Sequence, residues 1–411
     1  MYLSGSKWNT RKKRRRANPW RVLLLLSLIA AAVYVERTIV PALPPLFVLT
    51  PTPTRSPASY VLEAESLFQS GKLEQAEASY REAIAVSPED PLIYTNLARL
   101  QVFAGNYVGA ETSARNALLL NPNLAPAHAV LGWALDFQGG ERVVDARAAV
   151  ERALQLDPNL ASAYAYYAEV LMDISPENYQ DALQAARHAV ALDPNLLDAH
   201  RALGYTWERT QNYDQALESY QTALRINPNL AMLHLAVGNM KLNQQDTNAA
   251  IESYLKASTL SPTDSEPLTL IALAYARVGE YGKASQYAAN AAEKDPGSPY
   301  LHGDLGRMYY KNNEFDKAVR SFSLAIQGGT TESGAVVKGL PLDPGDRKSV
   351  EFYYTYGLAL AKLGNCDPAI QIFEALLRGV PADEIAVANA TEGLVICDVI
   401  QPTPTPPIET G

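Results

Sequence analysis

Two residue columns that recur about every 34 residues constrain this chain more than any other feature. A proline preceded by Asp, Asn or Ser recurs in a regular series of seven positions, at spacings of 34, 36, 36, 34, 34 and 34 residues. An alanine lies 12 residues before each proline, and this alanine column continues through two further units. The prolines are Pro88, Pro122, Pro158, Pro194, Pro228, Pro262 and Pro296; the alanines are Ala76, Ala110, Ala146, Ala182, Ala216, Ala250, Ala284, Ala318 and Ala369. Self-similarity of this kind predicts a row of stacked units instead of one globular core.

Both columns have a physical reason. A small residue at a fixed position lets two helices approach closely, so a larger side chain there would overpack the contact. A proline in the connection cannot continue the preceding helix. Helices of this length are marginal alone, so each unit is expected to bury its apolar face against its neighbours.

The fifth unit carries the fullest pattern: His200, Leu203, Gly204, Trp207, Ala216, Tyr220, Ala223 and Pro228. This pattern resembles the tetratricopeptide repeat (TPR), a helix–turn–helix unit of 34 residues. The resemblance implies an all-α fold, a right-handed α-solenoid of nine TPR-like repeats. Repeats 1–8 are expected over residues 58–332 and repeat 9 over residues 350–383. It also implies an interaction scaffold, but a fold of this kind does not identify its partner.

Two segments interrupt or end the array. Residues 333–349 are rich in Gly and Pro and are expected to form an inserted loop. Residues 384–400 are predicted to form a lone amphipathic helix that caps the exposed end of the stack.

The N-terminus has the composition of a membrane anchor. Residues 1–21 hold eight basic side chains and no acidic one. We expect a basic cytoplasmic tail over 1–19 and one transmembrane helix over 20–40, about 31 Å long against a hydrocarbon core of about 30 Å. The positive-inside rule then places the following residues outside. A cleaved signal peptide, or a nuclear or nucleic-acid address in RKKRRR, remains an alternative.

Pro/Thr-rich segments flank the repeats. A linker is expected over 41–57, which holds six prolines, and a tail of similar composition over 401–411. Such segments are extended spacers and resemble those of bacterial envelope proteins. O-linked sugar on them is a second interpretation.

Composition argues against several classes of function. The whole chain carries −9 and the residues after position 21 carry −17, so nucleic acid is a poor partner. The HExxH, phosphate-loop and GxSxG motifs do not occur in the sequence. Four of the five histidines occupy the fourth position of a unit, where other units have Tyr, and are expected to pack: His128, His200, His234 and His302. We therefore expect no enzyme activity, no cofactor, no metal site and no nucleic-acid partner.

The TPR resemblance implies that the first helix of each unit lines a concave groove. On this basis the candidate partner-binding residues are Arg99, Trp133, Arg201, Tyr205, Asn239, Arg307 and Tyr310. Aromatic residues and arginines are typical anchors of a protein or peptide partner. A solvated concave face without a dedicated ligand is the alternative.

The two cysteines are a disulfide candidate. Cys366 lies in the turn of the ninth unit and Cys397 near the end of the cap. If the cap takes the place of a tenth first helix, its end lies beside that turn, within reach of the roughly 7 Å that a disulfide allows between Cα atoms. Two unrelated thiols are the alternative.

These observations together predict a membrane-anchored scaffold for protein or peptide partners, with its repeats outside the cytoplasmic membrane, in envelope assembly, secretion or surface organisation. Two alternatives are a non-catalytic accessory subunit of a glycan- or pilus-assembly enzyme complex, and a cytoplasmic-facing regulator tethered by its N-terminus. The sequence does not indicate an oligomeric state.

Overall fold

The structure is a computed structural model that describes residues 18–39 and 55–399. The chain divides into two compact units, residues 1–55 and 56–411, each of which is described by itself. The basic tail up to residue 17, linker residues 40–54 and residues 400–411 lie outside the described residues.

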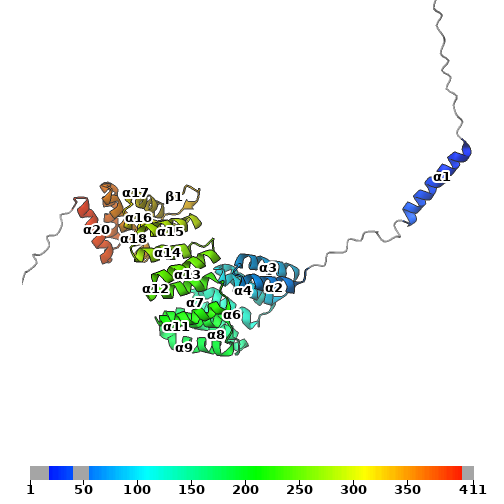
Figure 1. The fold of residues 1–411 in the computed structure, drawn as a ribbon, viewed down its shortest axis with the longest axis horizontal. Coiled ribbons are helices and arrows are strands. Elements are labelled where there is room, and N and C mark those ends of the chain that lie inside the picture. Colours follow the sequence, from blue (N-terminus) through cyan, green and yellow to red (C-terminus); the bar gives the residue numbers. More distant parts are fainter. Residues whose placement is uncertain (1–17, 40–54, 400–411) are drawn as a thin grey trace, which may run out of the picture. The chain divides into compact units, whose positions relative to one another are not determined.

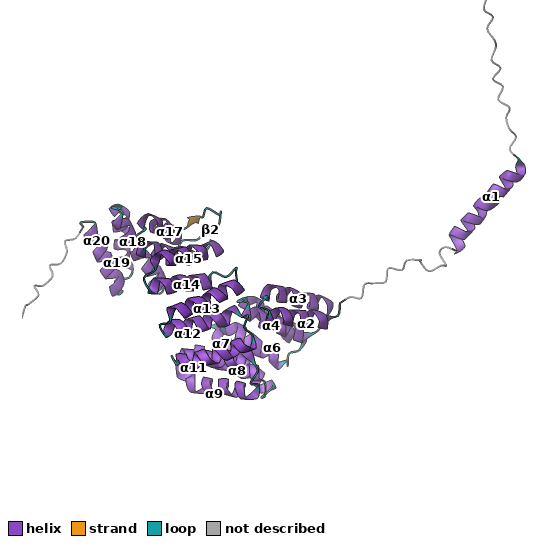
Figure 2. Cartoon of the chain, in the orientation of Figure 1, coloured by secondary structure: helices purple, strands orange, loops and turns teal. Residues whose placement is uncertain are grey.

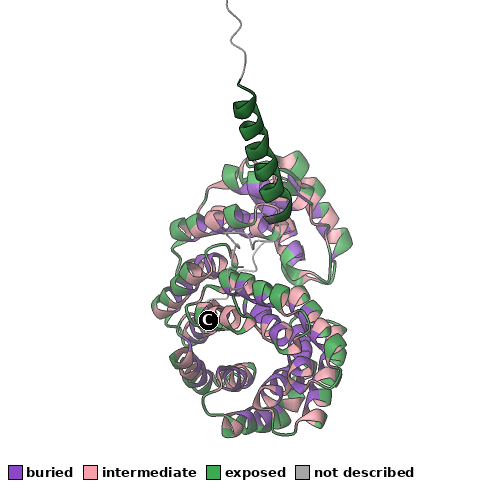
Figure 3. Ribbon diagram, turned by 90° about the vertical axis from the view of Figure 1, so that its right-hand side faces the viewer, coloured by how far each residue is buried: buried purple, intermediate pink, exposed green. Residues whose placement is uncertain are grey.

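Among the described residues of the first unit, 18–39 and 55, there is one α-helix. Helix α1 spans Pro19–Tyr34 and continues as a π-helical turn over Val35–Ile39. The Asn18 side chain caps it by accepting from the Trp20 N–H. Its apolar side chains are exposed on every face, as Figure 3 shows by its uniform colour. Residues Pro19–Thr38, with a mean hydropathy of 1.6, are long and apolar enough to cross a membrane, and a signal sequence would fit the same description.

The second unit is a helical stack whose elements follow one another in chain order (Figure 1). Within residues 55–399, nine helix pairs precede a final helix, and almost every described residue outside the turns is helical (Figure 2). The pairs are α2 (Pro57–Gln69) with α3 (Leu73–Val86), α4 (Pro91–Phe103) with α5 (Tyr107–Leu120), α6 (Ala125–Asp136) with α7 (Arg142–Leu156), α8 (Ala161–Ile174) with α9 (Tyr179–Leu192), α10 (Leu197–Arg209) with α11 (Tyr213–Ile226), α12 (Ala231–Asn243) with α13 (Thr247–Leu260), α14 (Glu266–Arg277) with α15 (Tyr281–Lys294), α16 (Pro299–Lys311) with α17 (Phe315–Gln327), and α18 (Arg347–Lys362) with α19 (Cys366–Gly379). A short 3-10 helix, Pro176–Asn178, lies between α8 and α9.

The recurring alanines lie where the two helices of each pair meet. All nine alanines of the first column have no exposed surface. In several pairs a glycine of the first helix faces an aromatic ring of the second. A Cβ on Gly238 would lie 2.4 Å from the Tyr254 ring, and one on Gly357 would lie 2.5 Å from the Phe373 ring. The predicted solenoid of nine helix pairs is confirmed, and its close contacts depend on small residues.

The inserted segment is more ordered than the expected loop. Strand β1 (Gly329–Thr330) pairs antiparallel with β2 (Val336–Val337). The chain then returns to the stack, where the Leu340 N–H donates to the Ala325 carbonyl at 2.9 Å. Helix α18 begins at Arg347, three residues before the expected start of the ninth repeat, because the Asp346 side chain caps it.

The final helix, α20, spans Glu384–Ile396 and packs against α18 and α19. It ends four residues before the expected boundary, and Asp398 beyond it has a φ of 58°. Cys397, directly after α20, is bonded to Cys366 at the start of α19, with 5.5 Å between the Cα atoms. The bond links the last helix to the ninth pair.

Ala216→Leu tests the alanine column. Ala216 is fully buried on α11, so the larger side chain should overpack the contact with α10 and cost about 1–3 kcal/mol of unfolding free energy in urea denaturation. Gln221→Leu, at an exposed position of the same helix, is the matched control and should change stability by less than about 0.5 kcal/mol. Equal effects of the two substitutions would contradict the close-contact explanation.

Candidate functional site

The first helices of repeats 2–5 form a continuous inner layer. Helix α4 contacts α6, α6 contacts α8, and α8 contacts α10. A single hydrophobic core consequently runs from Ala64 in repeat 1 to Met240 in repeat 6. The predicted concave face of these repeats is therefore largely an interior.

A set of contacts between repeat 1 and the turn after repeat 5 closes this part of the stack; we call it the clasp. The Asn227 amide donates to the Phe68 carbonyl at 3.1 Å, and the Asn229 amide donates to the Gln69 carbonyl at 2.9 Å. Gly71, with a φ of 74°, lies so close that a Cβ there would be 2.3 Å from the Asn229 carbonyl oxygen. Residues about 160 positions apart in the sequence are thus joined.

The amide of Asn227 bonds both to its own turn and across the clasp. Its side-chain oxygen accepts from the Asn229 N–H at 2.9 Å, as the carboxylates of Asp157 and Asp193 do in the equivalent turns. Asn227 also has an N–H group to donate across to repeat 1, which an ionised aspartate lacks. It is completely buried, so this donor needs its partner.

Arg99 and Asp198 form a second connection between distant repeats. The guanidinium Nε of Arg99 donates to Asp198 Oδ1 at 3.3 Å, and the Tyr166 hydroxyl donates to the same oxygen at 2.7 Å. Burial would raise the pKa of Asp198, but the charge and hydrogen bonds of Arg99 outweigh it and leave that pKa lowered. The pair therefore joins repeat 2 to repeat 5 as ions.

Trp133 and Arg201 lie in the same interior. Trp133 has no exposed surface, stacks on Tyr166 at a centroid distance of 4.5 Å, and donates to Glu169 Oε2 at 3.1 Å. The Arg201 guanidinium is over the Trp133 ring, 4.3 Å from its centroid, and pairs with Glu169 Oε1 at 2.6 Å. Arg201 is 4% exposed, so both residues support the wall of the site and present almost no surface to a partner.

A pocket of about 310 Å³ opens beside this network; we call it the acidic pocket. Its lining residues come from repeats 2–7, from Phe103 at the end of α4 to Glu266 at the start of α14. Its charged lining residues are Asp136, Glu169, Asp173, Arg201, Glu208, Asp264 and Glu266. The lining therefore carries six carboxyl groups and one guanidinium.

Asp136 is the least compensated of these carboxyls. It is 5% exposed, and no hydrogen bond to its Oδ1 is found among residues 18–39 and 55–399. Burial, together with the charges of Asp173 and Glu169, raises the pKa of Asp136 to about 8. Burial likewise raises the pKa of Glu169 to about 7, although Arg201 acts against it. The pocket thus holds carboxyl groups that lack enough positive charge to stabilise them as anions.

Two other predicted residues also line the acidic pocket. Tyr205 is half-buried and its hydroxyl donates to Asp173 Oδ1. Asn239, also half-buried, accepts from the Tyr254 hydroxyl at 2.7 Å. The pocket therefore brings together three of the seven predicted groove residues, Arg201, Tyr205 and Asn239.

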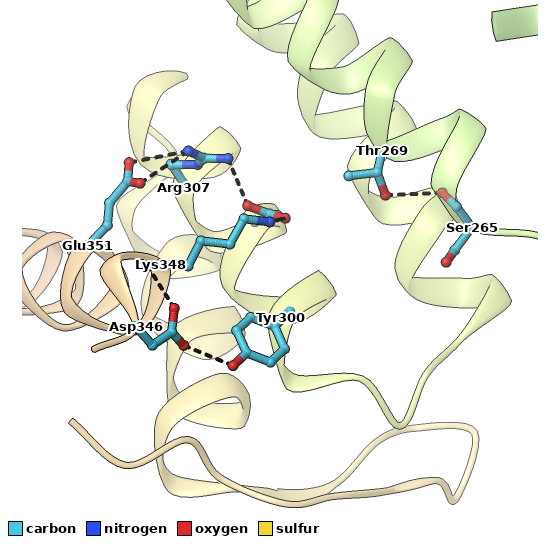
Figure 4. Close-up of polar contacts among 8 residues, drawn as sticks. Ser265, Thr269, Tyr300, Arg307, Asp346, Lys348 and Glu351 are labelled. Atoms are coloured by element: carbon cyan, nitrogen blue, oxygen red, sulfur yellow. Dashed lines mark hydrogen bonds and ion pairs between the residues drawn. The ribbon is translucent and has the colours of Figure 1, made fainter. Parts of the chain in front are cut away.

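Arg307 and Tyr310 lie elsewhere, on α16. Arg307 pairs with Asp304 at 2.7 Å and with Glu351 of repeat 9 at 3.3 Å, while Lys348 binds the other oxygen of Asp304 (Figure 4). Tyr310 is half-buried, with its ring 5.6 Å from that of Phe315. This second polar cluster links repeats 8 and 9.

The four repeat histidines have a shared structural role. Each forms a hydrogen bond between its Nε2 and the carbonyl of the proline six residues before it, at 2.8–2.9 Å: His128 to Pro122, His200 to Pro194, His234 to Pro228, and His302 to Pro296. They fasten the turn between consecutive repeats. In the described part of the chain, His, Cys, Asp and Glu form no cluster suited to a metal ion.

Sequence reasoning overlooked the acidic residues of the pocket and the two asparagines of the clasp. A signal for the acids existed, because Asp136, Glu169 and Glu208 occupy inner-face positions of three consecutive repeats. The clasp left no distinguishing signal at position 227, because Asn121 occupies the same position in an earlier turn.

Models of the tetratricopeptide repeat family match four segments of the chain, residues 64–102, 197–230, 233–264 and 269–332. The comparison with curated proteins gave no match.

Two solved structures are among those that match this chain. A structure of Pseudomonas aeruginosa pilF is 22% identical, covers 57% of this chain and 96% of its own, and has a TM-score of 0.44. A human IFIT1 dimer with m7Gppp-AAAA is 18% identical, covers 84% of this chain and 87% of its own, and has a TM-score of 0.48. At these levels neither structure informs the function of this chain.

Asn227→Asp should loosen the clasp. The carboxylate keeps the bond to the Asn229 N–H but cannot donate to the Phe68 carbonyl, so we expect a loss of about 1–3 kcal/mol and faster amide hydrogen exchange in α2. Asn121→Asp is the matched control, since Asn121 makes only the local turn bond to the Asn123 N–H. Unchanged exchange in α2 after Asn227→Asp would show that the clasp does not hold repeat 1.

Asp136→Asn should alter how stability depends on pH. The pKa of Asp136 is raised from 3.8 to about 8 in the folded state. Its protonated carboxyl therefore contributes fully to wild-type stability below pH 3.8, and this contribution is lost as the pH rises from 3.8 to about 8. We expect the unfolding free energy of Asp136→Asn, relative to that of wild type, to rise by about 1–3 kcal/mol between pH 5 and pH 9, measured by thermal unfolding.

Glu82→Gln on the exposed face of α3 makes the same change in charge and should give no pH-dependent gain. Parallel pH profiles for wild type and Asp136→Asn would mean that the Asp136 carboxyl is not destabilised by burial.

Proposed function

The chain is a tetratricopeptide repeat protein, and from this premise we propose that it is a membrane-anchored, non-catalytic scaffold that binds protein or peptide partners outside the cytoplasmic membrane. Tetratricopeptide repeats imply a scaffold for protein–protein interaction. The proposed setting is envelope assembly, secretion or surface organisation.

Helix α1 is the observation that carries the proposed anchoring. Leu23, Leu26 and Ile29 are 64%, 59% and 58% exposed, and no residue of α1 is buried. A helix that is apolar all round needs an apolar environment, and Pro19–Thr38 has the length of a membrane span. Lipid is the environment that fits its length and composition best.

The orientation follows from charge. The eight basic residues before the apolar stretch favour retention of the N-terminus in the cytoplasm. The repeats would then be on the other side, in a compartment where a disulfide persists. The bond between Cys366 and Cys397 is consistent with this placement.

We propose that the partner contacts the residues of the inner face that keep exposed surface. Tyr205 and Asn239 lie at the acidic pocket, and Arg307 and Tyr310 on α16. Arg99, whose side chain is 31% exposed, could contribute at the edge. Trp133 and Arg201 act by holding the surrounding wall in place.

Reporter fusions after residue 411 test the proposed topology. Alkaline phosphatase, which folds only where its disulfides form, should be active there, and a cytoplasmic fluorescent reporter at the same position should be dark. Changing the run of six basic residues at positions 11–16 to glutamine should weaken this orientation, because the charge bias that sets it is reduced.

The matched control changes six exposed basic residues of the repeats to glutamine, which lowers the positive charge equally without touching the flank. It should leave both reporter signals unchanged. An active fluorescent reporter and inactive phosphatase on the wild-type chain would place the repeats in the cytoplasm and favour a tethered regulator.

A further inference from the structure

We propose that the acidic pocket takes the cationic side chain of an arginine or lysine from a basic peptide segment of the partner, with the Asp136 carboxylate as its ion-pair acceptor. The inference rests on the proposed scaffold function and names the chemistry that its partner should present.

The charge of the pocket is the first support. Arg201 is the one basic residue among the described residues that line it, and its guanidinium is already engaged with Glu169. Among the remaining carboxyls, Asp173 accepts from the Tyr205 hydroxyl and forms a long ion pair with Arg209, at 3.9 Å, from outside the lining. Tyr220 donates to Glu208 at 2.6 Å, and the Glu266 N–H donates to Asp264 at 2.9 Å. The negative charge is therefore undercompensated until a cation enters.

Asp136 supplies the second and independent support. Its side chain is nine-tenths or more buried, lines the pocket, and leaves Oδ1 without a hydrogen bond from the described part of the chain. An unpaired buried carboxyl is costly, and each such group calls for an explanation. A guanidinium or ammonium group in the pocket would supply this carboxyl with the positive charge that it lacks.

The pocket walls provide apolar and aromatic surface for the uncharged part of an arginine or lysine side chain. Met232, Leu235 and Ala236 of α12 provide apolar surface for an aliphatic stem. Tyr107 and Phe137, whose rings stack at a centroid distance of 4.8 Å, add aromatic surface to the lining. Aromatic rings attract cations as well as apolar groups.

The volume of the pocket and the charges at its exposed edge also favour a basic side chain. A volume of about 310 Å³ is at the lower end of the roughly 300–1,000 Å³ typical of ligand pockets, so it suits a side chain and excludes a folded domain. Asp173 and Glu266 are exposed, and their charges would attract basic segments. The same charges disfavour an acidic peptide or a nucleic acid.

Methyl NMR on the full-length chain in nonionic detergent tests the proposal. With ¹³C-methyl methionine, Met232 reports on the pocket and Met308 on α16 reports outside it. Titration with N-acetylargininamide at pH 8.5, where more Asp136 is ionised, should shift the Met232 signal saturably and leave Met308 unchanged. A dissociation constant on the order of millimolar is expected for a probe of this size.

Three comparisons identify the recognised group. N-acetylcitrullinamide has nearly the same shape without the charge and should bind at least about tenfold more weakly. N-acetyllysinamide should bind, because its ammonium group carries the same charge. Glycinamide presents a chain N-terminus instead of a side chain and should bind more weakly than both cationic probes.

Two variants locate the binding. Asp136→Asn should weaken N-acetylargininamide about tenfold, while Glu82→Gln, with the same change in net charge on exposed α3, should leave it within about twofold. The stability measurements on Asp136→Asn establish that this variant is folded.

Equal binding of the citrulline probe, equal effects of the two variants, stronger binding of glycinamide, or no Met232 shift at all would each overturn the inference. The reporter fusions do not depend on Asp136. An outside topology without cation binding would refute the pocket assignment alone, whereas a cytoplasmic topology would refute the proposed scaffold setting.

Discussion

The close approach of paired helices, made possible by small residues, is the contact on which the rest of the structure depends. Nine buried alanines lie at one repeated position, and glycines such as Gly238 face an aromatic ring that a Cβ would meet at 2.4 Å. Because every pair buries a small residue at this position, neighbouring pairs stack closely along the chain. The curvature of the stack builds up from these local contacts.

That curvature converts a repeated surface into an interior in the first part of the array. The inner helices of repeats 2–5 contact one another, and the clasp joins repeat 1 to the turn after repeat 5. Side chains that are equivalent by sequence position consequently meet different surroundings. Trp133 and Arg201 are covered, whereas Arg307 at an inner position of repeat 8 keeps part of its surface.

Charged groups in the interior connect distant repeats of this stack, and they also leave a pocket whose negative charge exceeds its positive charge. Arg99 pairs with Asp198, and Arg201 with Glu169, so each of these four groups has a partner of opposite charge. Breaking either pair would leave a buried charge, which typically costs about 3–5 kcal/mol. Asp136 has no such partner, and its raised pKa is the physical sign of that difference.

The sequence by itself determined the repeated unit, the number of helix pairs and the small residues between them, because these depend on local spacing and recur nine times. It also indicated the inner face, since position within a repeat sets the direction of a side chain. Which inner residues are covered, which carboxyl lacks a partner, and which turn meets repeat 1 were decided only by tertiary structure. The reason is that these outcomes depend on small rotations added over several repeats, which bring Asn227 to Phe68 across 159 positions of sequence.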